Sequence, residues 1–138
     1  MAFLPYLFFG DNCREAFTRY HEIFGGDLQL MTMKDAPDNE SVPADKADLI
    51  IHASLTIGED LLMGSDDPMS ASFGPVQGMM VSYSTADADE AKRVFEALAE
   101  GGTVTQSLIE TFFSPAFGMC TDRYGTPWMV SAEQAQQG

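Results

Sequence analysis

The sequence predicts an α+β fold made of paired βαβββ modules, whose mixed sheets curl around a common cleft. A helix-start pattern occurs twice, at residues 12–15 and again at residues 87–90. Each predicted helix then meets a double glycine, at residues 25–26 and 101–102. Strand patterns flank both helices in the same order. One module cannot cover both faces of its four-stranded sheet, so we expect two such sheets to share a cleft.

Both helix-start patterns are capping boxes. An Asn or Asp caps the first turn, and a Glu three residues later reaches back to a free backbone N–H group. Apolar residues then follow at helical spacing. They are Ala16, Phe17, Tyr20, Ile23 and Phe24 in the first helix and Ala91, Val94, Phe95, Leu98 and Ala99 in the second. The double glycines suit left-handed C-terminal caps.

Alternating apolar patterns predict four strands in each module. The expected strands are residues 3–9, 28–33, 49–57 and 61–63, and then 79–84, 103–109, 117–121 and 127–131. We therefore expect a single domain of two repeated modules, residues 1–65 and 79–138, joined by a linker at residues 66–78. A polar loop at residues 34–47 lengthens the first module, either as a solvated excursion or as a lid or partner-contact segment.

Composition excludes several classes of protein. The chain has 138 residues and a mass of 15.0 kDa, and 45% of its residues are apolar, enough for a real core. Its net charge of −14 repels phosphate backbones and anionic membranes, so we expect no nucleic acid and no membrane partner. The first residues lack the basic segment of a secretion signal, and two cysteines are too few for a disulfide framework. We therefore expect a cytoplasmic protein.

Three stretches resemble the PhnB-like branch of the vicinal oxygen chelate superfamily, which includes glyoxalases and bleomycin-resistance proteins. They are PYLFFGDNCREAF near the start, IIHASLTIGEDLLMGSD in the middle and GGTVTQSLIETFFSPAFGMCTDRYGTPWMVS near the end. The resemblance covers essentially the whole chain. It implies a glyoxalase/bleomycin-resistance/dioxygenase-like fold and a homodimer with a small-molecule cleft in each protomer.

The same resemblance implies a divalent metal ion held by four side chains that polarises the substrate. The four ligand positions fall at or near Leu4, His52, Met80 and Met129, with Tyr6 as an alternative to the first. Of these, only His52 is a good ligand for a hard or borderline metal, because thioethers suit soft ions. We therefore expect a degenerate metal site, in which His52 and Glu110 are the one pair that could bind a divalent ion.

His52 and Glu110 are also the predicted catalytic pair. Strand alternation places His52 with Ser54 and Thr56 on one polar face, where an imidazole can act as a general base. Glu110 has apolar neighbours in sequence, and a carboxylate in such surroundings can exchange a proton. The alternatives are a structural histidine within the sheet and a strand-end glutamate in solvent.

Aromatic side chains are the predicted ligand-binding wall, together with the hydroxyl of Ser54. They are Tyr6, Phe8, Tyr83, Phe113 and Trp128. Phe8 and Tyr83 occupy equivalent positions of the repeat, which predicts opposite walls. The alternative is that most of these rings lie in the core. Cys13 falls in the first helical turn, where the helix dipole is expected to lower its pKa.

Three functions remain open. The first is binding of a small molecule in the cleft, with a degenerate metal site. The second is a metal-dependent lyase, isomerase or dioxygenase of the glyoxalase type, and the third is sequestration of a cationic drug, which the negative charge favours. Some relatives of this branch carry the name of a demethylubiquinone methyltransferase. A nucleotide-shaped methyl donor normally needs a glycine-rich turn on a doubly wound sheet, and the sequence predicts neither.

Overall fold

The computed structural model describes residues 3–35, 46–67 and 76–133. The chain divides into two compact units, Met1–Gly74 and Pro75–Gly138, and each is described by itself. Much of the expected loop at residues 34–47 and of the expected linker at residues 66–78 lies outside the described residues. Within the described ranges, no helix is both long enough and apolar enough to cross a membrane.

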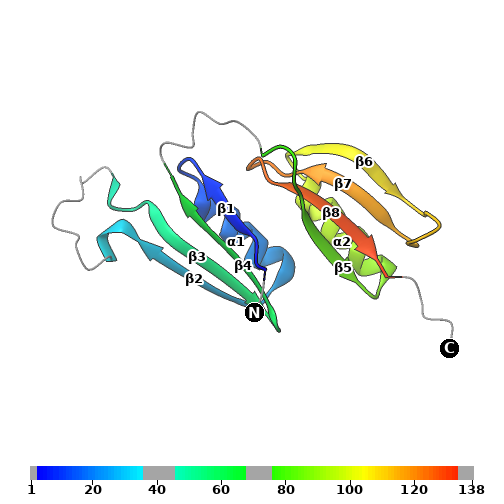
Figure 1. Ribbon diagram of the computed structural model, residues 1–138, viewed down its shortest axis with the longest axis horizontal. Coiled ribbons are helices and arrows are strands. Elements are labelled where there is room, and N and C mark those ends of the chain that lie inside the picture. The colour runs from blue at the N-terminus through cyan, green and yellow to red at the C-terminus, as the bar shows by residue number, and fades with distance from the viewer. Residues whose placement is uncertain (1–2, 36–45, 68–75, 134–138) are drawn as a thin grey trace. The chain divides into compact units, whose positions relative to one another are not determined.

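The first unit is a four-stranded mixed sheet with one helix on one face (Figure 1). Its elements are β1 (Tyr6–Phe9), α1 (Cys13–Phe24), β2 (Asp27–Thr32), the short 3-10 helix η1 (Met33–Asp35), β3 (Ile50–Ile57) and β4 (Asp60–Asp66). The strand order is β1-β4-β3-β2, in which β1 runs parallel to β4 and the other neighbours are antiparallel.

The second unit repeats this arrangement. It comprises β5 (Val81–Thr85), α2 (Ala88–Ala99), β6 (Thr103–Ile109), β7 (Phe117–Thr121) and β8 (Pro127–Ala132), with the strand order β5-β8-β7-β6. Again the first strand is parallel to the last one and the remaining pairs are antiparallel. The predicted α+β fold of paired βαβββ modules with mixed sheets is therefore confirmed.

Each helix packs an aromatic ring directly onto a glycine of its sheet. A Cβ atom added to Gly64 would lie 2.7 Å from Cε1 of Phe17, and one added to Gly118 would lie 2.8 Å from Cε2 of Phe95. Only residues without a Cβ atom allow so close an approach. The predicted apolar stripes are the faces that meet these glycines, since Phe17 and Phe95 are both buried.

The helix starts differ from the predicted capping boxes. Asn12 makes no side-chain cap hydrogen bond within the described part of the chain; instead, the backbone N–H of Cys13 donates to Oδ1 of Asp66 at 2.9 Å. In α2, Asp87 caps as predicted by accepting from the N–H of Asp89 at 2.9 Å. Its expected partner Glu90 pairs with Arg93 instead, because that guanidinium lies one turn further along the helix.

The helix ends agree with the prediction only in part. Gly25 and Gly101 have positive φ values of 73° and 77°, which glycine adopts readily. The expected left-handed caps are wrong, because Gly25 has a ψ of −147° and the residue that caps α2 is Glu100, in an extended conformation. These turns bring the chain back toward the sheet for β2 and β6.

Candidate functional site

The candidate site is the face of the first sheet opposite α1, which we call the open face. Alternation along β1 buries Leu7 and Phe9 toward α1 and leaves Tyr6 and Phe8 on the open face, 38% and 59% exposed. On β3, the same alternation buries Ala53 and Leu55 and exposes His52. The open face is lined by Tyr6, Phe8, Met31, His52, Ser54 and Met63.

Strand register places these side chains in two neighbouring rows. Tyr6 lies opposite Met63, which lies opposite Ser54. In the adjacent row, His52 lies opposite Met31 on β2. Sequence reasoning missed both methionines. Period-two alternation was a signal for their faces, but their neighbours depend on strand pairing.

Three rings form a continuous series that we call the Phe8–Tyr6–His52 ladder. The ring centroids of Tyr6 and Phe8 are 5.2 Å apart at an interplanar angle of 45°. Those of Tyr6 and His52 are 5.9 Å apart at 39°, and the Tyr6 hydroxyl lies 3.4 Å from Nδ1 of His52. The ladder joins β1 to β3 across β4. It combines an exposed apolar surface with one imidazole that can donate, accept or bind a proton.

In the second unit, the structure places two of the predicted wall residues on the helix side of their sheet. Trp128 is 2% exposed, and its indole N–H donates to Oδ2 of Asp122 at 2.9 Å. Tyr83 pairs with Val130, which is fully buried, and Tyr83 acts electrostatically on Arg93 of α2. In-register neighbours share a face. The expected equivalence of Tyr83 with Phe8 is therefore wrong by one residue, and the indole of Trp128 belongs to the core.

The other two predicted residues lie in the connection between β6 and β7. Glu110 follows β6 directly and is exposed, which agrees with the alternative of a strand-end glutamate in solvent and not with a carboxylate among apolar neighbours. Phe113 is 48% exposed, and its ring centroid is 5.1 Å from those of Phe112 and Phe117. His52 and Glu110 belong to different units. Their convergence in one cleft stays a prediction.

The described residues do not fit the divalent metal that the fold family implies. Leu4 has no donor atom, and Met80 and Met129 offer only thioethers, which hard and borderline ions bind poorly. Among the residues that the structure describes, no three His, Cys, Asp or Glu side chains gather in a metal-binding group. We therefore derive no chemical step through a metal.

Neither cysteine is an activated nucleophile. Burial and, to a smaller extent, the nearby Asp66 carboxylate raise the pKa of the Cys13 thiol to about 12. The expected lowering by the helix dipole is wrong, because the desolvation of a thiolate in the core outweighs it. Burial likewise raises the pKa of Cys120 to about 11, with Asp122 as the second cause.

Comparison with known proteins gives a consistent set of relatives. The model of the 3-demethylubiquinone-9 3-methyltransferase family matches residues 1–131. Protein YjdN of Escherichia coli (strain K12) is 32% identical over an alignment 148 positions long, gaps included, which covers 99% of this chain and 98% of that protein. The crystal structure of protein PA1353 from Pseudomonas aeruginosa is 43% identical with a TM-score of 0.87, covering 97% of this chain and 98% of that one.

Two more distant structures share the fold. A protein from Bacillus cereus described as a putative 3-demethylubiquinone-9 3-methyltransferase, PhnB protein, is 24% identical with a TM-score of 0.77, covering 96% of this chain and 99% of that one. A glyoxalase/bleomycin resistance protein/dioxygenase family enzyme from Burkholderia phytofirmans PsJN is 15% identical with a TM-score of 0.62, covering 96% and 100%. At these identities the likeness concerns the architecture alone.

Proposed function

Since the chain belongs to the 3-demethylubiquinone-9 3-methyltransferase family, a PhnB-like group of the vicinal oxygen chelate superfamily, we propose that it binds a small, partly apolar molecule on the open face of the first sheet. The observation that carries the proposal is the Phe8–Tyr6–His52 ladder. Aromatic rings usually serve a sheet by packing into its core. Here Phe8 and Tyr6 remain 59% and 38% exposed.

The composition of the open face suits a ligand with a flat apolar part. Aromatic rings offer large, rigid contact areas, and thioethers adapt to irregular shapes, so Met31 and Met63 extend the surface on both sides of His52. The hydroxyl of Ser54 and the imidazole of His52 supply the few polar groups that orient a ligand. A chain with a net charge of −14 favours neutral or cationic ligands over anionic ones.

The proposed function is binding, with a degenerate metal site. Of the four implied ligand positions, His52 alone carries a donor for a hard or borderline ion. We leave methyl transfer out of the proposal, although the family description names it. A nucleotide-shaped methyl donor normally occupies a glycine-rich turn on a doubly wound sheet, whereas both sheets here have βαβββ topology.

A neutral fluorescent probe, N-phenyl-1-naphthylamine, tests the proposal. Its emission rises when it enters an apolar site, and titration yields a dissociation constant. We expect Phe8→Ala to raise this constant about tenfold, because the variant removes a ring that the bound probe would cover. Phe112→Ala is the matched control, since it removes a ring of the second unit that is 90% exposed.

Circular dichroism establishes that both variants are folded. The proposal fails if Phe8→Ala binds the probe as tightly as the wild type, or if Phe112→Ala weakens binding by the same factor. Either result would mean that the probe does not occupy the open face.

A further inference from the structure

We infer that Tyr6 fixes the tautomer of His52, and that the open face thereby selects planar apolar ligands carrying an oxygen acceptor at one edge. The inference deepens the proposed function and rests on it, because it names the class of ligand for the same site. It starts from the contact between the Tyr6 hydroxyl and Nδ1 of His52 at 3.4 Å.

The direction of this hydrogen bond follows from the chemistry of its two groups. A phenol is a better donor than acceptor, and the unprotonated nitrogen of a neutral imidazole is a good acceptor. The favoured arrangement therefore has the Tyr6 O–H donating to Nδ1. Since a neutral imidazole carries a single proton, that proton then resides on Nε2.

Within the described ranges, no acceptor faces the Nε2–H group at hydrogen-bond distance. Among the described residues, the Tyr6 hydroxyl is the only hydrogen-bond partner of the His52 ring. Directly opposite His52 on β2 lies Met31, whose thioether is a weak acceptor. His52 is exposed, so its free N–H group is open to a ligand.

The position of this donor defines the ligand class. The rings of Phe8 and Tyr6 lie 5.2 Å apart and offer a surface for a flat apolar body. Because Nδ1 faces the Tyr6 hydroxyl, Nε2–H points away from Tyr6, and a flat ligand on these rings reaches it only when it extends past His52 with its edge. An oxygen acceptor at that edge, such as the carbonyl of an aromatic ketone, completes the hydrogen bond that the protein leaves open.

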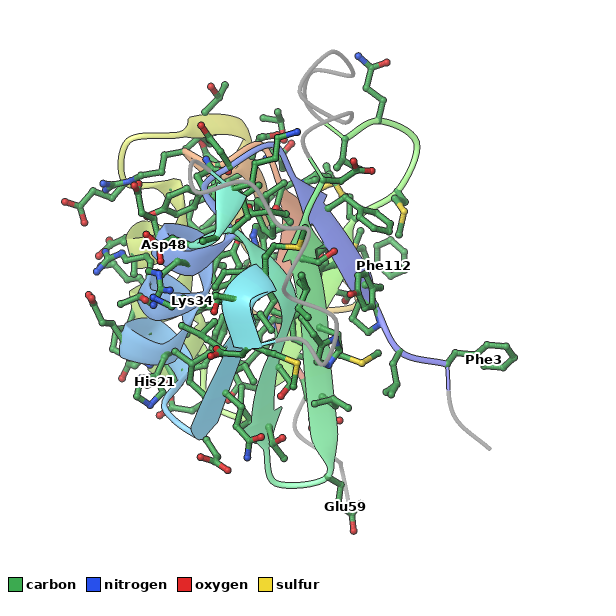
Figure 2. All side chains as sticks on the ribbon, turned by 90° about the vertical axis from the view of Figure 1, so that its left-hand side faces the viewer. Phe3, His21, Lys34, Asp48, Glu59 and Phe112 are labelled. Atoms are coloured by element: carbon green, nitrogen blue, oxygen red, sulfur yellow. The ribbon has the colours of Figure 1, made fainter. Side chains whose placement is uncertain are left out.

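Nitrogen NMR tests the tautomer without any ligand. The chain contains two histidines, so the ring signals of ¹⁵N-labelled protein are readily assigned. In spectra recorded at pH 8.5, we expect the proton of the neutral His52 ring to reside on Nε2. Tyr6→Phe should shift the tautomer ratio about threefold toward Nδ1–H, the effect of losing one hydrogen bond. His21 lies on α1 and serves as the internal control, with unchanged signals (Figure 2). A proton on Nδ1 in the wild type would overturn the inference.

Two compounds of the same shape test the ligand class. 2-Acetylnaphthalene carries a carbonyl oxygen where 2-isopropenylnaphthalene carries a methylene group. We expect the ketone to bind about fivefold more tightly, as followed by amide and ring chemical shifts. His52→Phe keeps a ring but removes the donor, and should bring the two affinities together. His21→Gln should preserve the difference.

The outcomes separate this inference from the proposed function. Equal binding of the two compounds to the wild type would overturn the ligand class and leave the binding site intact. Binding of neither compound would overturn both the ligand class and the proposed function. A fivefold preference that survives in His52→Phe would show that another group recognises the oxygen, which also overturns the inference.

Discussion

Cys13 shows how two local effects compete at one residue. A cysteine in the first turn of a helix gains from the helix dipole when it ionises. At this position the thiol is fully buried and Asp66 lies beside the helix start, so the charged form loses its hydration and meets a negative neighbour. Burial outweighs the dipole, and the pKa rises to about 12. The position of Cys13 in the helix can be predicted from the sequence, but the burial of its thiol depends on tertiary packing.

We expect both thiols to be inert in the folded protein at pH 8. With pKa values of about 12 for Cys13 and about 11 for Cys120, almost no thiolate is present, and neither side chain is accessible. Ellman's reagent should therefore label neither cysteine in native buffer and both in urea. Rapid labelling of the native protein would contradict the burial.

The same shift predicts how stability depends on alkaline pH. The folded pKa of Cys13 lies above its ordinary value of 9.0, so its contribution to the free energy of unfolding is fully present below pH 9. It is lost as the pH rises toward 12, because the unfolded chain releases the proton first. Above pH 9, the free energy of unfolding should therefore fall less steeply with pH in Cys13→Ala than in the wild type. The difference in slope should reach up to about 1.4 kcal/mol per pH unit, as measured by urea unfolding at a series of pH values.

The aromatic residues show where sequence reasoning on single residues stops. The exposed positions of Tyr6 and Phe8 follow from alternation in β1, which a sequence displays directly. Tyr83 lies on the opposite side from the expected one, because a shift of one residue reverses every side chain of a strand. Only the pairing of β5 with β8 fixes that register.

At the scale of elements, the two modules cap their helices differently. In α2 the cap comes from Asp87, the residue before the helix, as local sequence predicts. In α1 it comes from Asp66 at the end of β4, and the same carboxylate accepts from the N–H of Ile50 at 2.8 Å. Asp66 thus joins a helix start to two strands. No local pattern reveals this contact, because the two partners are far apart in the chain.

This difference predicts an unequal response to cap removal. Asp87→Ala should lower the free energy of unfolding by about 1 kcal/mol, and Asn12→Ala by about 0.3 kcal/mol or less, because only Asp87 accepts a cap hydrogen bond. Asp66→Ala leaves two N–H groups of buried residues without an acceptor and should cost about 2–4 kcal/mol.

Urea denaturation at neutral pH measures all three cap variants. Asp48→Ala is the control, because its ion pair with Lys34 lies at the surface, where such pairs contribute little (Figure 2). If Asn12→Ala and Asp87→Ala lowered the free energy of unfolding equally, both residues would cap their helices, as the sequence predicts. That result would contradict the unequal caps of α1 and α2.

At the scale of the whole molecule, the repeat was the strongest signal in the sequence. Helix start, apolar stripe and double glycine recur together, so the order of elements in both modules followed from local patterns. The arrangement of the modules depends on contacts between distant surfaces, which periodicity does not encode. The predicted cleft and the predicted catalytic pair depend on such contacts between modules, since His52 and Glu110 lie in different units.

Each unit presents sheet edges that another chain could cover. In the first sheet the edge strands are β1 and β2, and in the second they are β5 and β6. Val104 and Ile109 of β6 are 46% and 47% exposed, and Met31 of β2 is 46% exposed. Edge strands and exposed apolar side chains favour association with a second copy.

We therefore predict a homodimer in solution, whose stability depends on salt. Size-exclusion chromatography with light scattering should give twice the chain mass of 15.0 kDa. Two chains of net charge −14 repel each other, and salt screens that repulsion. Raising sodium chloride from about 50 mM to about 500 mM should thus lower the dissociation constant of the dimer. A mass of 15.0 kDa at every protein concentration and salt level would contradict the prediction. Any ligand bound on the open face would then be bound by a single chain.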